Sequence, residues 1–181
     1  MNPILLDLSQ LRESRERIDR TFEAAAFPAE ADDAFEVRAG VRLAFDIHKA
    51  GTQFHLVGRV QTTLGLSCGR CLEPFPFPVE VPFDLLYVPH TANVGEGEVA
   101  VEDDDLSVAY YRNDEIDLGQ LMREQFYLAL PMKPLCRESC RGLCPECGTN
   151  LNSATCACVR TWTDPRLEGL RSLGGKNGRT V

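Results

Sequence analysis

Long apolar runs, histidines and the common catalytic motifs are all scarce in this 181-residue sequence. No apolar stretch approaches the roughly eighteen residues of a membrane span, and the first residues lack a basic region followed by a long apolar one. The three histidines, His48, His55 and His90, form no ligand-like pair. No phosphate-cradling glycine motif, serine nucleophile elbow or carboxylate pair stands out. We therefore expect a soluble, unexported, cytoplasmic protein that is not an enzyme and has no small-molecule substrate.

Cysteine is the residue type that the sequence has in excess. Eight cysteines are present, and six of them lie within residues 136–158. Six thiols in so short a segment bind a metal or form disulfides, and disulfides are disfavoured in a reducing compartment. We therefore predict that zinc is bound, as one or two ions, by cysteines drawn from eight positions: Cys68, Cys71, Cys136, Cys140, Cys144, Cys147, Cys156 and Cys158.

The spacing of these cysteines indicates tetrahedral sites. A Cys-x-x-Cys turn places two thiolates on one side of a tight loop, and two such turns can surround one zinc ion. Cys144-Pro-Glu-Cys147-Gly has this form, and its glycine allows a left-handed residue after the second ligand. Cys156 and Cys158 would complete the four ligands.

The allocation of the other four cysteines stays open. In one arrangement, Cys136 and Cys140 join Cys68 and Cys71 in a second four-thiolate site that ties the sheet to the tail. In another, a single zinc ion is held by the cysteines at 136, 140, 144 and 147, and the others are free or partnered. The upstream pair alone could also be a reduced pair that packs a strand end.

Two catalytic uses of the cysteines are disfavoured. Cys140-x-x-x-Cys144-x-x-Cys147 has the spacing of the iron–sulfur site in radical enzymes that use S-adenosylmethionine, but those need a large barrel after the motif, and only thirty-four residues follow. A thioredoxin-like role for Cys68 and Cys71 would place the pair at a helix N-terminus. The segments that flank this pair are predicted strands instead.

Alternation of apolar and polar residues dominates the middle of the chain. It predicts a long strand over residues 35–47, a turn at 49–51 and a return strand over 54–66, which together form a hairpin. Further strands are predicted over residues 78–88 and 106–112, and a short one over residues 4–8. Residues 27–33 predict a loop, and residues 91–105, which contain Glu102-Asp-Asp-Asp105, a mobile acidic loop.

Two segments have apolar residues at helical spacing. Residues 11–26 favour a helix through Leu11, Ile18 and Phe22, with a polar edge strand over residues 17–22 as the alternative. The clearer helix covers residues 117–130, with Asp117 as its N-cap and Gln120 in a variant of the capping box. Pro131 and Pro134 follow the helix and lead into the cysteine cluster.

Together these elements predict an α+β fold, in which a twisted antiparallel β-sheet or partial barrel carries one main helix and a small C-terminal zinc-binding module. We expect a β-rich body over residues 1–132 with its supporting helix at 117–130, a cysteine-rich zinc module over residues 133–163 and a flexible tail over residues 164–181. Trp162, Leu167 and Leu170 are the residues that would dock the tail.

The formal net charge of −8 is distributed unevenly. Residues 133–181 carry a net charge of +4, whereas residues 1–132 carry −12. A basic metal-bearing tail could contact phosphates while the acidic body repels nucleic acid. The acidic body would equally suit a basic protein as a partner.

From about residue 35 to residue 158, the sequence resembles the bacterial YceD family. The resemblance is carried by Leu66-Ser-Cys68-Gly-Arg-Cys71-Leu-Glu-Pro-Phe75, by Ile116-Asp-Leu118 with Leu128-Ala-Leu-Pro131, and by Cys136-x-x-x-Cys140-Arg-Gly-Leu-Cys144-Pro-Glu-Cys147-Gly. Members of that family are implicated in the accumulation of large-subunit ribosomal RNA in bacteria and plastids. The resemblance therefore implies a non-enzymatic role in ribosome assembly, with metal that stabilises structure.

The leading hypothesis is accordingly a zinc-stabilised assembly factor that binds large-subunit ribosomal RNA or a ribosomal protein. The alternative is a redox- or metal-responsive regulator whose cysteine cluster releases zinc on oxidation. That alternative requires exposed thiols of low pKa, whereas closed four-thiolate zinc sites are usually inert.

Overall fold

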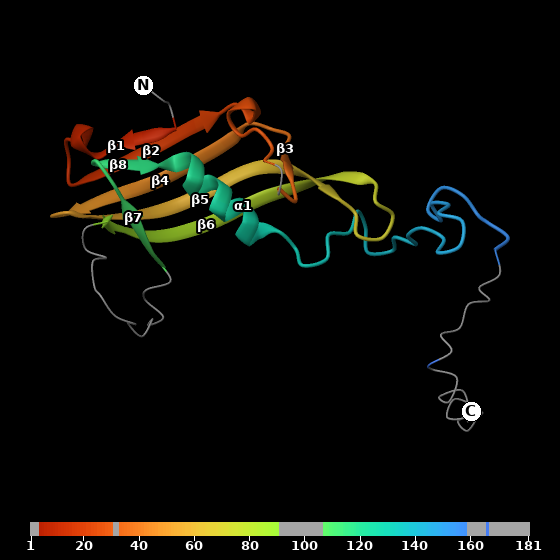
Figure 1. The fold of residues 1–181 in the computed structure, drawn as a ribbon. Helices are drawn as coiled ribbons and strands as arrows, with labels where there is room; N and C mark the ends of the chain where they lie inside the picture. Colours follow the sequence, from red (N-terminus) through yellow and green to blue (C-terminus); the bar gives the residue numbers. More distant parts are fainter. Residues whose placement is uncertain (1–3, 31–32, 91–106, 159–165, 167–181) are drawn as a thin grey trace, which may run out of the picture.

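The computed structural model describes residues 4–30, 33–90, 107–158 and 166, and its regular elements end at Ala129 (Figure 1). The strands are β1 (Leu5–Asp7), β2 (Arg15–Phe22), β3 (Glu36–Val37), β4 (Val41–Ala50), β5 (Gln53–Ser67), β6 (Pro74–Pro89), β7 (Val108–Tyr111) and β8 (Glu115–Asp117). The helices are α1 (Leu118–Ala129) and two 3-10 turns, η1 (Leu8–Gln10) and η2 (Ala24–Ala26).

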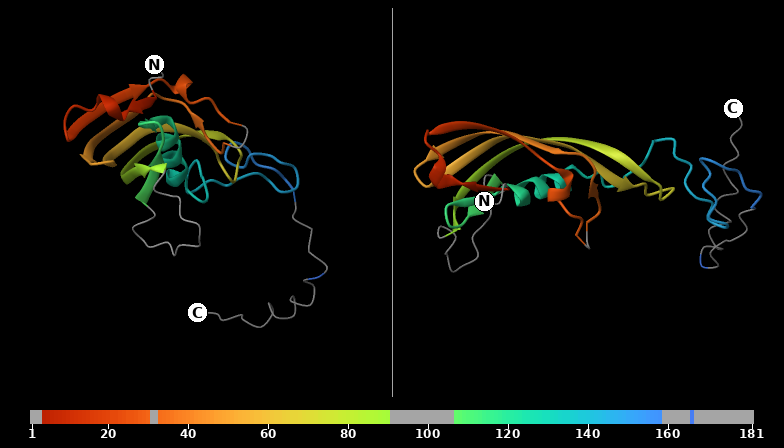
Figure 2. Two further views of the ribbon diagram at one scale, coloured as in Figure 1. Left: turned by 60° about the vertical axis from the view of Figure 1, so that its left-hand side comes forward. Right: turned by 90° about the horizontal axis from the view of Figure 1, so that it is seen from above.

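The body has two layers. One is a twisted sheet in the order β2-β4-β5-β6-β7, with β3 paired to β5. The other consists of α1 and the small β1–β8 sheet, which lie against one face of the large sheet (Figure 2). The predicted α+β class with one main helix is therefore confirmed. The described strands form an open sheet, with β2 and β7 at its two edges, rather than a closed barrel.

The expectation of a wholly antiparallel sheet was wrong at one place. Strand β7 pairs with β6 in parallel, from Leu86↔Val108 to Pro89↔Tyr111. A parallel neighbour needs a long connection, and the eighteen residues between Pro89 and Val108 are enough for the chain to return. The strand predicted over residues 106–112 is confirmed as β7, while the predicted acidic loop at 91–105 lies outside the described residues.

The central hairpin is formed by β4 and β5, as the alternation predicts. Gly51 adopts a φ of +64° in the turn, a conformation that suits glycine. The predicted strand over 35–47 is interrupted, however. Between the pairs Val37↔Leu64 and Arg42↔Gln61, four residues on one side (38–41) span only two on the other (62–63). The two extra residues form a bulge between β3 and β4. Because their number is even, Val37 and Val41 stay on the same face of the sheet, and the alternation of apolar and polar residues continues across the bulge.

Strand β6 is the longest of the described strands, and four prolines lie at positions whose backbone groups point away from β5. Cys68 N–H donates to Glu73 O where the ladder with β5 begins, so odd-numbered residues of β6 direct their backbone groups at β5. The prolines occupy the even positions 74, 76, 78 and 82. They therefore remove N–H groups only from the edge that faces away from β5, which leaves that edge unable to pair along its first half.

Helix α1 covers the sheet with an apolar stripe, as predicted. Asp117 caps the helix by accepting from the N–H groups of Gly119 (2.8 Å) and Gln120 (3.0 Å). The amide of Gln120 bonds Glu124 instead of the cap, so the predicted capping box is only half formed. The buried residues of the helix are Leu118, Leu121, Met122, Gln125 and Phe126. Phe126 makes edge contacts with the rings of Phe27 and Phe35, and these contacts join the helix to the loop before β3.

The helix favoured over residues 11–26 was wrong, and the edge-strand alternative is what the structure contains. Strand β2 pairs with β4 over its full length, from Arg15↔His48 to Phe22↔Val41. In this pairing the strand β4 provides hydrogen-bond partners for the backbone of β2, and Ile18 and Phe22 lie on the core side of the sheet. This tertiary pairing outweighs the local preference for a helix. Strand β8 was not predicted, because its three residues carry too short a pattern. Its partner β1 confirms the strand expected at residues 4–8.

A nearly buried carboxylate fastens the loop before β3 to α1. The Asp33 side chain is 2% exposed and lies 2.6 Å from the Arg123 guanidinium, and Tyr127 O–H also donates to it. Burial alone would raise the pKa of the Asp33 carboxyl, but hydrogen bonds from Glu30 N–H, Tyr127 and Arg123 outweigh it and hold that pKa below its ordinary value. The ionised carboxylate thus stabilises the fold.

We predict that Asp33→Ala lowers the free energy of unfolding by about 3 kcal/mol at neutral pH, because it leaves the Arg123 charge without its main partner. The control Glu80→Ala, which breaks an exposed pair with Arg59, should cost no more than about 1 kcal/mol. The Asp33 contribution should be complete above about pH 5 and disappear as the pH falls through the depressed folded pKa. Urea unfolding at several pH values checks this, and equal costs for the two variants would contradict it.

Candidate metal centres

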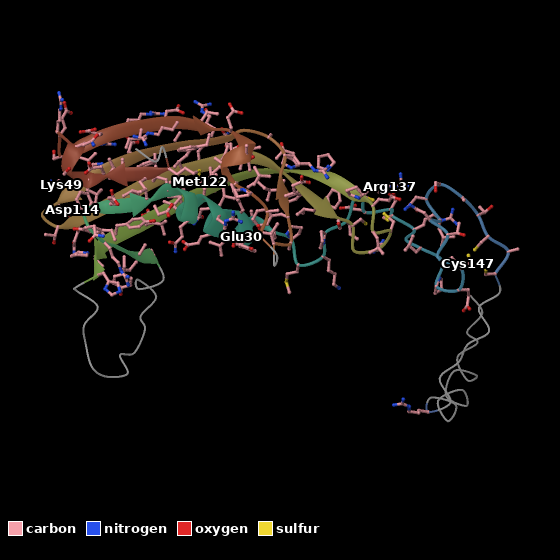
Figure 3. All side chains as sticks on the ribbon, turned by 45° about the horizontal axis from the view of Figure 1, so that its top comes forward. Glu30, Lys49, Asp114, Met122, Arg137 and Cys147 are labelled. Carbon is pink, nitrogen blue, oxygen red and sulfur yellow. The ribbon has the colours of Figure 1, made fainter. Side chains whose placement is uncertain are left out.

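The eight cysteines gather into two groups of four, one at the tip of the β5–β6 hairpin and one farther along the C-terminal segment. The hairpin-tip group consists of Cys68, Cys71, Cys136 and Cys140, and the outer group of Cys144, Cys147, Cys156 and Cys158. Within each group all sulfur atoms lie within 4.8 Å of one another. In Figure 3, Arg137 marks the hairpin-tip group at the end of β5 and β6, and Cys147 marks the outer group farther along the C-terminal segment.

The hairpin-tip group has the dimensions of a tetrahedral thiolate site. Two of its Sγ–Sγ distances, between Cys68 and Cys140 and between Cys71 and Cys136, are 3.8 Å each. A zinc–sulfur bond of about 2.3 Å gives a tetrahedron with edges of about 3.8 Å. Three of the four thiols are buried, and Phe75, Leu135 and Leu143 pack around them. A metal ion held there would be closed off from solvent on most sides.

The turn between β5 and β6 places the first two sulfurs. Leu72, directly after Cys71, has a φ of 62°, and its N–H donates to Cys68 O (2.9 Å). The C-terminal segment then docks on this turn by two backbone bonds, from Gly69 N–H to Pro134 O (2.8 Å) and from Leu143 N–H to Arg70 O (3.1 Å). The hairpin-tip group is therefore assembled from two distant stretches of chain.

Arg70 and Asn152 complete the surroundings of the hairpin-tip group, and neither was identified from the sequence. The Arg70 guanidinium donates to the carbonyl oxygens of Cys140 (2.8 Å) and Glu138 (3.2 Å). The Asn152 amide donates to Cys140 Sγ (3.3 Å), while its oxygen accepts from Arg141 N–H (2.8 Å). Asn152 belongs to the loop of the outer group, so it links the two groups. In the sequence, only its position between Cys147 and Cys156 could have pointed to it.

The outer group is built on a small knuckle. Leu143 and Asn150 form a bridge, Cys144 N–H donates to Thr149 O (2.8 Å), and Gly148 N–H donates to Cys144 O (2.9 Å). Gly148 has a φ of +71°, as predicted for the residue after the second cysteine. The outer group is less enclosed, because Cys147 and Cys158 are exposed. All four of its cysteines come from residues 144–158.

Hydrogen bonds favour a thiolate in each group. The backbone N–H groups of Cys136, Cys71 and Arg70 lower the pKa of the Cys68 thiol to about 6. In the outer group, the hydroxyl and N–H of Thr149 lower the pKa of Cys147 to about 6. A hydrogen bond to Cys147 in turn raises the pKa of Cys158 to about 12. Four thiolates so close together repel one another, and a divalent cation is the chemistry that would relieve this repulsion.

This grouping corresponds to the sequence arrangement in which Cys136 and Cys140 join the upstream pair. It separates Cys140 from Cys144 and Cys147, so the spacing typical of a radical-enzyme cluster does not become one site. Among the described residues, no histidine belongs to a group of potential metal ligands. Apart from residue 166, the predicted tail at 164–181 lies outside the described residues, as do the docking residues Trp162, Leu167 and Leu170.

The fold and the two groups define a class: an α+β protein whose long hairpin meets a cysteine-rich C-terminal segment with two potential four-cysteine metal centres. Within that class, the chain belongs to the YceD family, described as "Large ribosomal RNA subunit accumulation protein YceD", whose profile it matches over residues 56–174. The resemblance found in the sequence is thereby confirmed. The residues matched include most of β5, the second strand of the central hairpin, and all eight cysteines.

Curated relatives carry the same family name or none. The chain is 29% identical to the chloroplastic Large ribosomal RNA subunit accumulation protein YCED homolog 1 of Zea mays, over 76% of this chain and 54% of that protein. It is 27% identical to the Arabidopsis thaliana homolog 1 (74% and 48%) and 28% identical to the uncharacterized protein YlbN of Bacillus subtilis (60% and 59%). The chain thus spans about half the length of the curated relatives it matches. No solved structure matches it.

The names of the two plant relatives describe accumulation proteins, not enzymes. In the described part of the chain, no helix is long and apolar enough to cross a membrane.

We predict that Gly142→Ala loosens the docking of the C-terminal segment, because Gly142 has a φ of +75° and an added Cβ would lie 3.0 Å from Arg70 O. Gly148→Ala is the matched control, since its φ is +71° but nothing lies within 4 Å. Hydrogen exchange of the Gly69 amide, which bonds Pro134 O, should accelerate roughly tenfold in Gly142→Ala only. Equal acceleration in both variants would contradict the proposed role of this close contact.

Proposed function

We propose that this protein is a zinc-binding, non-enzymatic ribosome-assembly factor that supports the accumulation of large-subunit ribosomal RNA by binding that RNA or a ribosomal protein. Membership of the YceD family is the observation that carries the proposal. The factor would act in the compartment where ribosomes assemble, which is the cytoplasm for a bacterial protein. The chain spans about half of its curated relatives, so the role is proposed for this chain and not transferred from them.

Zinc is the ion that best fits the donor set. Four cysteine thiolates with no oxygen ligand suit zinc in a closed, tetrahedral, structural site. The residues that would hold one ion are Cys68, Cys71, Cys136 and Cys140, and those that would hold the other are Cys144, Cys147, Cys156 and Cys158. Bound zinc would supply a cross-link between β5–β6 and the C-terminal segment at the first site and within the knuckle at the second.

The separation of charge supports a partner that is either RNA or a basic protein. Residues 133–181 have a net charge of +4, and Arg137 and Arg141 are exposed beside the cysteine groups. Residues 1–132 have a net charge of −12, which suits a basic ribosomal protein. The cysteine-rich segment would therefore approach RNA phosphates, and the body would face a protein.

We predict two zinc ions per chain by elemental analysis of the purified protein. Cys68→Ser and Cys156→Ser should each lower the content to one, because each variant removes a ligand from a different group. One zinc ion that is lost only in Cys156→Ser would mean that the upstream pair holds no metal, and the cross-link at the hairpin tip would then be wrong.

We further predict that the full-length protein captures large-subunit precursors from cells at physiological salt. The double variant Arg137→Gln and Arg141→Gln should capture less if RNA is the partner, whereas the matched double variant Arg12→Gln and Arg59→Gln should not. Capture that survives nuclease treatment would assign the contact to a ribosomal protein. Absence of large-subunit precursors from the capture would overturn the proposed role.

The regulatory alternative is favoured by the exposure of Cys147 and Cys158 in the outer group and by the lowered pKa of the Cys147 thiol. In the hairpin-tip group, three thiols are buried, as expected of an inert structural site. Release of zinc by mild peroxide from the outer group would favour regulation, and an unreactive outer group would eliminate it.

A further inference from the structure

Strand β2 presents an open edge. Lys49 N–H donates to Ser14 O (2.8 Å) where β2 meets β4, so even-numbered residues of β2 direct their backbone groups at β4. The backbone groups of Arg15, Arg17, Asp19 and Thr21 therefore point away from the sheet. Within the described part of the chain, no strand pairs with this side of β2. Such a row of donors and acceptors is a template for a further strand.

The opposite side of the sheet has no comparable template. Along β6, prolines at 74, 76, 78 and 82 remove the N–H groups of the free edge, and β7 covers the last residues from Leu86 onward. Among the described strands, only β2 therefore offers a long regular edge on which the large sheet could grow, because β7 at the opposite edge has just four residues.

The side chains of β2 have a charge pattern that is complementary to itself. The sequence Arg15-Glu-Arg-Ile-Asp-Arg-Thr21 changes sign about Ile18. If two copies of this strand run antiparallel with Ile18 opposite Ile18, then Arg17 faces Asp19 and Glu16 faces Arg20. By symmetry each pair occurs twice. Opposite charges that face each other across strands stabilise the pairing, and the same register places no two like charges opposite each other.

The space beside β2 suits the same arrangement. On the core-facing side of β2, a hollow of about 650 Å³ opens between β1 and β2, and its lining includes Leu5, Leu11 and Ile18. Because Ile18 directs its backbone groups at β4, the two copies of Ile18 would form a non-hydrogen-bonded pair, in which side chains approach most closely. The partner's Ile18 would therefore enter the apolar part of the hollow.

We propose that β2 is the interface of a symmetric homodimer, in which two copies pair their β2 strands antiparallel about Ile18 and form one continuous sheet. The contacts that Asp19 and Glu16 make within their own chain are compatible with this. Asp19 binds Arg42 of its own chain through two bonds, of 3.1 and 2.7 Å, on the outer face, where the partner's Arg17 would join it. Glu16 uses Oε1 to accept from the N–H groups of Arg12 and Glu13, which leaves Oε2 for the partner's Arg20. The inference is independent of the proposed function.

The test is sedimentation of the full-length protein over a concentration series, at low and moderate salt. We expect a monomer–dimer equilibrium that weakens as salt rises. Arg17→Glu should weaken dimerisation by roughly tenfold or more, because it places a second carboxylate opposite Asp19 twice in each dimer. Arg12→Glu, which makes the same charge change just outside the strand, should leave the equilibrium unchanged.

Mixing variants tests the register itself. Arg17→Glu and Asp19→Arg should each remain monomeric alone, but a mixture of the two should form a heterodimer, because both cross-strand positions then pair opposite charges again. Loss of the Arg42 contact could unfold Asp19→Arg, and in that case Arg17→Pro is measured alone as the second variant. The N–H of Arg17 points away from β4, so proline there blocks only the pairing between the two copies. A monomeric wild-type protein, a dimer that survives both Arg17→Glu and Arg17→Pro, or folded charge variants that fail to form the heterodimer would overturn the proposal.

Discussion

The position of the C-terminal segment depends on one contact, between the β5–β6 turn and residues 134–143. After Ala129 the described chain has no further helix or strand, only the bridge between Leu143 and Asn150. What holds it are the bonds from Gly69 and Leu143, the Arg70 guanidinium and the four sulfurs of the hairpin-tip group. A segment so poor in apolar residues cannot bury enough surface to fold by itself, so its order rests on these polar contacts and on whatever the sulfurs bind.

The body is organised to carry that turn away from the core. Strands β5 and β6 are longer than their neighbours, and their register runs unbroken from Phe54↔Tyr87 to Ser67↔Pro74. The pair therefore extends past the region covered by α1, as Figure 2 shows. The prolines along the outer side of β6 keep this extension from pairing with other chains, while the β5 side supplies all the hydrogen bonds that the extension needs.

Much of this fold was accessible from sequence, because most of its elements have strong local signals. Alternation identified β4, β5 and β6, and the Asp117 cap identified the start of α1. Strand β2 was misjudged, since Leu11, Ile18 and Phe22 fit a helix as well as a strand, and only the pairing with β4 decides between them. Strand β7 was predicted, but its parallel pairing with β6 could not be foreseen from its four residues. At the candidate site, the cysteines were found by spacing, whereas Arg70 and Asn152 act through carbonyl and sulfur contacts that spacing does not encode.

The two cysteine groups differ in how far along the chain their members lie. At the hairpin tip, Cys68 meets Cys140 across 72 positions and Cys71 meets Cys136 across 65, whereas the outer group closes within residues 144–158. Loop-closure entropy makes the distant group the later one to form, after the sheet has folded and the whole hairpin is in place. During synthesis, a metal ion would close the outer group as soon as residues 144–158 emerge, whereas the hairpin-tip group would close only after the β5–β6 hairpin ahead of it has formed.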